Sequence, residues 1–170
     1  MEQLRERFFG LHPYLISSVA AVLTVAQIIL AIVLHGDAPD AVEWIGWIAL
    51  WSAGVFGMLP MFIFRRRGGV SAGDSYVKTT SLVNTGLYAV VRHPQNGTAW
   101  LLICLGVMLL AWHWSSVLLG GISMILAYAD TFKADQRCIA KFGEPYRDYI
   151  ERVPRVNVLA GLWRVLRERL

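Results

Sequence analysis

The chain has 170 residues, of which 56% are hydrophobic and 16% are charged, and its formal net charge at pH 7 is +4. This composition is too apolar for an ordinary soluble domain and indicates a membrane-embedded protein. The basic residues lie beside apolar segments, so membrane topology and lipid headgroups explain the positive charge better than nucleic-acid binding does.

The first apolar segment covers residues 13–34 and contains no charged residue. At about 1.5 Å of rise per residue, a helix of this length crosses a hydrocarbon core of about 30 Å. The segment is longer than the apolar core of a cleaved signal peptide, so we expect it to remain as the first membrane span. The connection at residues 35–43 contains acidic residues and neither Lys nor Arg, so we expect it to face outward.

A second span is predicted over residues 42–64, with tryptophans near its start and three consecutive arginines after its end. Two shorter apolar segments, 98–112 and 115–129, flank His113 and predict a short helical hairpin with its turn on the outer side. All sixteen Lys and Arg residues then lie on one side of the membrane, as the positive-inside rule requires. The sequence therefore predicts an all-α, polytopic membrane protein with four transmembrane helices and both termini in the cytoplasm.

Residues 130–170 are predicted to form cytoplasmic helices. The first part is charged and ends in a turn at Phe142 and Gly143, and a short helix is expected from Pro145 to Arg152. In the tail, apolar residues recur at helical spacing opposite arginines, which predicts a helix lying on an anionic membrane surface. With no repeat and no second domain, we treat residues 1–170 as one integral-membrane domain.

The cysteines and histidines predict neither a disulfide nor a metal site. Cys104 lies in an apolar segment and Cys138 in a charged one, so we do not expect them to pair. The four histidines are scattered along the chain and lack the spacing of zinc ligands.

The sequence LVNTGLYAVVRHP, residues 82–94, carries polar residues to the start of the third apolar segment. Proline is favoured in the first turn of a helix, so we interpret Pro94 as the helix entry and His93 as its boundary residue. His93 would then lie near backbone N–H groups that have no partner within the helix.

The predicted hairpin leaves the cytoplasmic side after Pro94 and returns to it near Asp130. Two polar segments that are distant in sequence must therefore meet, and we expect them to form a pocket. In the alternative interpretation, the basic residues only anchor the spans and the tyrosines belong to the inner aromatic belt. The expected pocket walls carry two groups of residues: Tyr88, Arg92 and His93 on one side, and Asp130, Asp135, Gln136, Tyr146 and Tyr149 on the other.

The sequence LVNTGLYAVVRHPQ, followed by the two apolar segments and then by FGEPYRDYIERVPR, resembles the isoprenylcysteine carboxyl methyltransferase family and the related phospholipid methyltransferases. The resemblance covers about residues 81–155. It implies a cytosol-facing pocket for S-adenosylmethionine and a lipophilic acceptor that reaches the pocket through the bilayer. It also implies cofactor contacts at Thr80, Ser81, Leu82, Val83, Tyr88, His93, Pro94, Gln95 and Asn96.

The chain departs from the family pattern on the segment after the hairpin. Where the family usually has two glutamates, this chain has Ala134 and Asp135, and Asp135 is the candidate to replace the lost cofactor contact. Asp130 stands where the resemblance places an acceptor-binding arginine. A carboxylate there favours a neutral or cationic acceptor over an anionic one. Alternatively, Asp130 pairs with Lys133 or Arg137 on its own helix.

Transfer of an activated sulfonium methyl group requires positioning more than acid–base chemistry. Tyr88 and Tyr146 are candidates to face the sulfonium, and no catalytic residue is assigned. The resemblance therefore predicts S-adenosylmethionine-dependent methyl transfer to a lipophilic or amphiphilic acceptor, in contact with membrane lipids and without nucleic acid. Two alternatives stay open: a nicotinamide-dependent membrane protein like the sterol or enoyl reductases, and a catalytically silent relative that binds a lipid or a partner.

Overall fold

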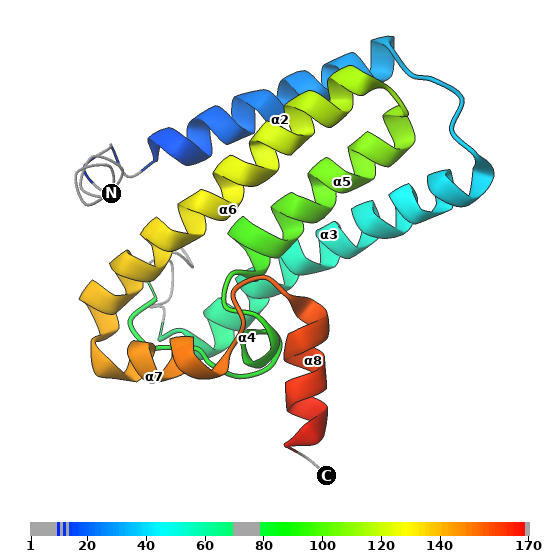
Figure 1. Ribbon diagram of the computed structural model, residues 1–170. Coiled ribbons are helices and arrows are strands. Elements are labelled where there is room, and N and C mark those ends of the chain that lie inside the picture. The colour runs from blue at the N-terminus through cyan, green and yellow to red at the C-terminus, as the bar shows by residue number, and fades with distance from the viewer. Residues whose placement is uncertain (1–9, 11, 13, 70–78, 169–170) are drawn as a thin grey trace.

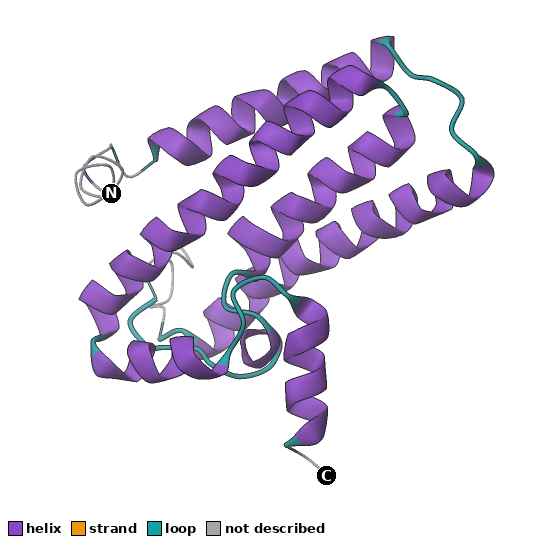
Figure 2. Ribbon diagram, viewed as in Figure 1, coloured by secondary structure: helices purple, strands orange, loops and turns teal. Residues whose placement is uncertain are grey.

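The computed structural model describes residues 10, 12, 14–69 and 79–168. Within this part of the chain all regular structure is helical, as predicted (Figures 1 and 2). The elements are α2 (Leu15–Val33), α3 (Asp40–Arg67), α4 (Leu87–Val90), the π-helical turn η2 (Pro94–Ala99), α5 (Trp100–Ala111), α6 (Trp114–Phe142), α7 (Glu144–Arg152) and α8 (Val158–Arg167).

Four helical segments are long and apolar enough to cross a membrane, which confirms the predicted number among the described residues. They are α2, α3, the continuous segment formed by η2 and α5, and α6. α3 extends beyond the predicted second span at both ends, because it includes acidic residues in its first turn and three arginines in its last. Each charge has the sign that the helix dipole favours at that end.

α6 does not end at residue 129 but continues through the charged residues to Phe142. The sequence from Ile122 to Phe142 contains neither glycine nor proline, so nothing in it interrupts the helix. Gly143 then adopts a positive φ of 65°, in the left-handed region that favours glycine, and ends the helix at the predicted turn. The polar residues 130–142 are therefore a rigid continuation of an apolar helix.

The long helices lie side by side in the order α2, α6, α5, α3 (Figure 1). α6 contacts both α2 and α5, and α3 packs along α5 and η2. Consequently α2 and α3 form the two edges of this layer. α4, α7 and α8 gather at the end of the layer where α6 finishes (Figure 1).

Small side chains fill the contacts between the long helices. Gly46 of α3 and Gly106 of α5 lie where the two helices approach closely, and a Cβ at Gly106 would be 3.0 Å from the carbonyl oxygen of Gly46. Large apolar side chains such as Val22, Ile32 and Trp51 are exposed instead. Small residues inside and large apolar residues outside are the arrangement expected of helices surrounded by lipid.

A buried network of hydrogen bonds joins α2, α5 and α6. The hydroxyl groups of Thr24 and Ser123 are 2.7 Å apart, and Trp100 Nε1 donates to Thr24 Oγ1 at 2.9 Å. One turn further along α2, Gln27 Nε2 donates to the carbonyl oxygen of Cys104 and to the hydroxyl of Ser116. Each polar side chain of this network thus finds at least one partner on a neighbouring helix, as expected where water is absent, although Gln27 Oε1 has no hydrogen-bond partner among the described residues.

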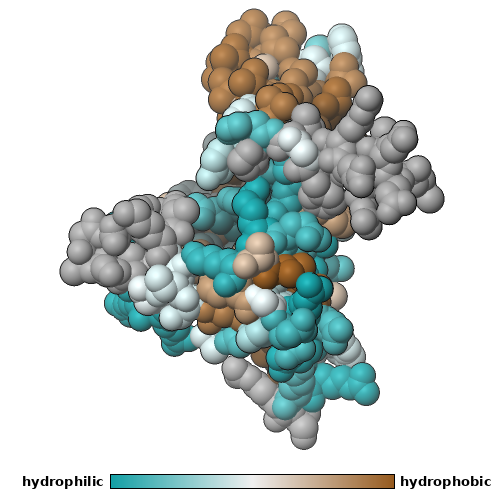
Figure 3. All heavy atoms as spheres, turned by 90° about the vertical axis from the view of Figure 1, so that its left-hand side faces the viewer, coloured by the Kyte–Doolittle hydropathy of each residue, from teal (hydrophilic) through white to brown (hydrophobic). Residues whose placement is uncertain are grey.

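The end of the molecule that carries α7 is polar. Figure 3 views it directly and shows mostly hydrophilic residues over the middle and lower parts of the described surface, with a small hydrophobic patch among them and a larger hydrophobic region above. The predicted helix at 145–152 is confirmed as α7. The predicted amphipathic tail helix is α8, in which Leu159 and Trp163 are exposed while Arg164 donates to the carbonyl oxygen of Ala89. Binding of α8 to an anionic membrane surface stays a prediction.

Candidate functional site

The two motif segments that are distant in sequence meet through backbone hydrogen bonds. The N–H of Arg92 donates to the carbonyl oxygen of Pro154 at 3.0 Å, and the N–H of His93 donates to that of Arg155 at 3.1 Å. Val91 is extended between α4 and η2, which exposes these N–H groups to the second segment. The predicted meeting of residues 82–94 with the C-terminal region is therefore observed.

Asp135 of α6 lies at the centre of this meeting and is only 4% exposed. Its Oδ1 is 2.7 Å from His93 Nε2 and accepts a hydrogen bond from the Tyr146 hydroxyl at 2.8 Å. Its Oδ2 is 2.9 Å from Arg155 Nη2 and 3.4 Å from Arg92 Nη1. We call these five residues the Asp135 cluster. One carboxylate thus connects α6 to α7 and to both motif segments.

The two arginines of the cluster are held differently. Arg92 is buried, and its Nε has no hydrogen-bond partner among the described residues. Arg155 also has one buried nitrogen, Nη1, without a hydrogen-bond partner among the described residues, but it lies against the ring of Phe132, with its guanidinium carbon 3.5 Å from the ring centroid. Both cations therefore depend on Asp135 for charge compensation, and Arg155 gains a cation–π contact in addition.

Aromatic residues form the side of the site next to α4. The Tyr149 hydroxyl donates to the carbonyl oxygen of Tyr88 at 2.7 Å, and the rings of Tyr146 and Tyr149 have centroids 5.5 Å apart. Phe64, near the end of α3, packs against Tyr88 at a centroid distance of 4.9 Å. Burial raises the pKa of Tyr146 and the pKa of Tyr149, so both phenols remain neutral hydrogen-bond donors at physiological pH.

A cavity of about 400 Å³ opens beside the Asp135 cluster. We call it the polar cavity. Eight of the residues predicted to contact the cofactor line it: Ser81, Leu82, Val83, Tyr88, His93, Pro94, Gln95 and Asn96. Gln95 and Asn96 belong to the first turn of a helix, where backbone N–H groups lack intrahelical partners. The cavity can therefore offer aromatic faces and hydrogen-bond donors to the same ligand.

Some predicted residues lie elsewhere. Thr80 is not among the residues that line the cavity, although its neighbour Thr79 is, and the Thr80 hydroxyl donates to the carbonyl oxygen of Gly69. Asp135 is not a lining residue either, but it holds His93 and Tyr146, which are. Gln136 is exposed and does not line the cavity.

Asp130 does not line the polar cavity. Its side chain is buried with 5% of the residue exposed, and its Oδ1 has no hydrogen-bond partner among the described residues. Arg137, Lys133 and His93 are near enough to act on its charge. Asp130 lies five residues before Asp135, so the two carboxylates leave α6 in different directions.

Several residues of the site were not predicted. One face of α6 contributes Ala134, Arg137, Cys138 and Lys141 to the cavity, and of these only Ala134 stands at a position where the resemblance places a cofactor contact. Their three- and four-residue spacing beside Asp135 was a readable signal of a common helix face. Arg155 ends the second motif and could have been noticed there, whereas Phe64 of α3 and Tyr14, which precedes α2, have no such signal. No family model, curated protein or solved structure matches the chain.

The Asp135 cluster is expected to stabilise the folded protein, and removing the charge of its carboxylate tests this. Replacing the carboxylate in Asp135→Asn keeps the shape of the side chain but leaves Arg92 buried without its counter-charge. Loss of one partner from a buried ion pair costs about 3 to 5 kcal/mol of unfolding free energy. We expect a clear drop in the midpoint of denaturant-induced unfolding of the detergent-solubilised protein. The control is Asp148→Asn, because Asp148 is exposed on α7 and its loss should change stability by less than about 0.5 kcal/mol. Equal midpoints for the two variants would contradict the role of Asp135.

Proposed function

We propose that this protein transfers a methyl group from S-adenosylmethionine to a lipophilic or amphiphilic acceptor at the cytoplasmic membrane surface. One observation carries this proposal: a single cavity is lined by residues from both segments that resemble the isoprenylcysteine carboxyl methyltransferase and phospholipid methyltransferase families. The first segment contributes residues 81–96 and the second contributes Phe142, Tyr146 and Tyr149. The membrane-spanning helices support an acceptor that is itself dissolved in lipid.

The residues of the polar cavity fit S-adenosylmethionine. The volume of about 400 Å³ falls in the usual range for small-molecule sites, about 300 to 1,000 Å³. Tyr88 and Tyr146 offer aromatic faces to a sulfonium cation, and Arg137 and Lys141 offer donors to an amino-acid carboxylate. When bound, the cofactor supplies an activated methyl group.

The residues of the chain would bind the cofactor, orient it toward the acceptor and shield both from water. Asp135 holds the His93 ring and the Tyr146 hydroxyl by short hydrogen bonds, which restricts the motion of two side chains that line the cavity. Holding two reactants at the right separation supplies a large share of the rate in a simple group transfer. We therefore treat Asp135 as a positioning residue.

We place the polar cavity on the cytoplasmic side. The arginines that end α3 lie next to Phe64, which lines the cavity, whereas the connection between α2 and α3 carries Asp37 and neither Lys nor Arg. The positive-inside rule assigns the basic end to the cytoplasm. The cavity would then lie at headgroup depth, where a soluble cofactor and a lipid-anchored acceptor can meet.

The acceptor is proposed to be neutral or cationic, and an amine acceptor must lose its proton before it takes the methyl group, because a protonated amine has no lone pair. Asp130 is a buried carboxylate with an unpartnered oxygen at the point where α6 enters the polar end, and it lies within electrostatic range of His93. Arg137 and Lys141 have the opposite charge, and we assign them to the carboxylate of the cofactor. In the alternative assignment, Asp130 only neutralises neighbouring cations on α6.

Cofactor binding is the direct test of this function. S-adenosylmethionine and a reduced nicotinamide cofactor are titrated separately against the detergent-solubilised protein by calorimetry. We expect S-adenosylmethionine to bind, and Ala134→Leu to weaken it roughly tenfold or more, because the added atoms overfill the cavity. Ala140→Leu is the matched control, since Ala140 is exposed on the same helix. Binding of the nicotinamide alone would favour the reductase-like alternative, and binding of neither would favour the silent relative.

The proposed orientation is tested by labelling cysteines in sealed vesicles with a membrane-impermeant maleimide, in a background with Cys104→Ala and Cys138→Ala. We expect Asp37→Cys to react from the outside. Asp148→Cys should react only after permeabilisation, because α7 lies at the basic end. The reverse pattern would place the polar cavity outside the cell and contradict access from the cytosol.

The charge preference is tested with a long-chain amine and a long-chain carboxylate of equal length, using methylated product as the readout. The native protein should prefer the amine, because Asp130 repels an anion at this low-dielectric boundary. In Asp130→Asn, the ratio of methylated amine to methylated carboxylate should be smaller than in the native protein. If the substitution leaves this ratio unchanged, Asp130 only neutralises neighbouring cations on α6 and does not select the acceptor.

A further inference from the structure

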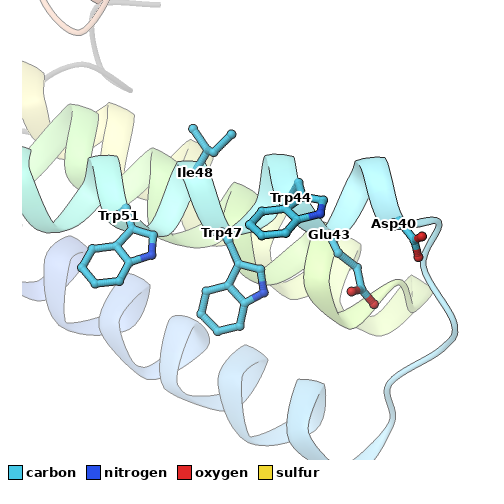
Figure 4. Close-up of a pocket in the computed structure, with 6 residues that line it drawn as sticks. All are labelled: Asp40, Glu43, Trp44, Trp47, Ile48 and Trp51. Carbon is cyan, nitrogen blue, oxygen red and sulfur yellow. The ribbon is translucent and has the colours of Figure 1, made fainter.

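A second cavity lies far from the polar cavity, on the outer flank of α3. It has a volume of about 520 Å³ and shares no lining residue with the polar cavity. We call it the indole groove (Figure 4). It occupies the first turns of α3, at the opposite end of that helix from its three arginines. Its lining residues are Asp40, Glu43, Trp44, Trp47, Ile48 and Trp51.

The tryptophans of the groove are spaced by three and four residues, so they share one face of α3. They are 70%, 50% and 77% exposed at Trp44, Trp47 and Trp51. The indoles of Trp47 and Trp51 project from the same side of the helix as Glu43, while Ile48 points away (Figure 4). The groove is therefore an open aromatic surface with a carboxylate beside it.

Each carboxylate of the groove lies one helical turn from an indole. Asp40 precedes Trp44 by four residues and Glu43 precedes Trp47 by four, which makes each pair neighbours on the helix surface. Neither carboxylate takes part in an ion pair among the described residues. The sequence from residue 34 to residue 64 contains no Lys or Arg. The groove thus carries negative charge that no cation in the described part of the chain pairs with.

The position of the groove in the membrane follows from the length of α3. Its 28 residues extend over about 42 Å at 1.5 Å per residue, close to the 40 to 45 Å of a bilayer with its headgroup layers. With the arginines in one headgroup layer, the first turns of α3 reach the other. The helix dipole accounts for acidic residues in a first turn, but it does not account for three exposed indoles beside them.

We propose that the indole groove binds the trimethylammonium headgroup of a choline phospholipid in the outer leaflet. Tryptophan has the strongest cation–π attraction among the side chains, and quaternary ammonium groups are the ligands for which aromatic cages are best suited. Asp40 and Glu43 supply the opposite charge, and the amphipathic indole rings are suited to the interfacial glycerol region between the headgroups and the acyl chains. A second copy of the chain fits less well, because it would bring the same uncompensated carboxylates together. This inference does not depend on methyl transfer.

The test uses the full chain in a maltoside detergent, with native mass spectrometry to count bound lipids. The probes are short-chain phosphatidylcholine, phosphatidylethanolamine and phosphatidylglycerol with identical acyl chains. We expect phosphatidylcholine to bind most tightly. Trp47→Leu and Glu43→Gln should each weaken it about three- to tenfold, because each removes one attraction to the cation and keeps a side chain of similar polarity or size.

Trp114→Leu is the matched control. Trp114 is 71% exposed at the same end of the molecule but is not part of the groove, so its loss should leave phosphatidylcholine affinity unchanged. Far-ultraviolet circular dichroism confirms that each variant keeps its helical content. Equal binding of the three lipids, tighter binding of phosphatidylethanolamine, or an equal effect of Trp114→Leu and Trp47→Leu would overturn the proposal and leave the tryptophans as an ordinary interfacial belt.

Discussion

A buried carboxylate remains ionised only where cations and hydrogen-bond donors replace water, and Asp135 has four such partners from three parts of the chain. Its helix, α6, is apolar for its first half and reaches the polar end without interruption. The carboxylate therefore fixes where the segment after α4 and the segment after α7 come to rest. The backbone hydrogen bonds from Arg92 and His93 to the second segment complete this connection. The shape of the polar cavity depends on these contacts more than on any single lining residue.

The packing of the long helices explains why the polar site lies at one end of the molecule. Glycines and other small residues let α3 and α5 approach closely, and large apolar side chains remain on the outer surface of the layer. Such a surface is the one expected of helices surrounded by lipid. Charged and aromatic residues can then gather only where the helices emerge, and the polar cavity and the indole groove lie at opposite ends of α3.

Much of this architecture could be predicted, because hydropathy and helix length are local properties of a sequence. The segment before Pro94 and the return near Asp130 had to meet once two adjacent spans were recognised, and most residues of the first motif do line the cavity. Contacts between side chains of different helices were not predictable in the same way. Nothing in the sequence indicates that Trp100 bonds to Thr24, that Phe64 packs on Tyr88, or that Arg155 shares Asp135 with Arg92. The side of a helix on which a charge lies also depends on exact register. For that reason Asp135 was expected to contact the cofactor, whereas in the structure it lies behind His93 and Tyr146, which line the cavity.

Photo-crosslinking can locate the S-adenosylmethionine site that the two motif segments are proposed to build together. The protein in lipid nanodiscs is irradiated with 8-azido-S-adenosylmethionine, and the labelled peptides are identified by mass spectrometry, with excess unlabelled cofactor as competitor. We expect labelling within residues 79–96 and 134–149 that excess unlabelled cofactor abolishes. Competable labelling confined to α2 or to the first half of α3, or no competable labelling at all, would contradict it.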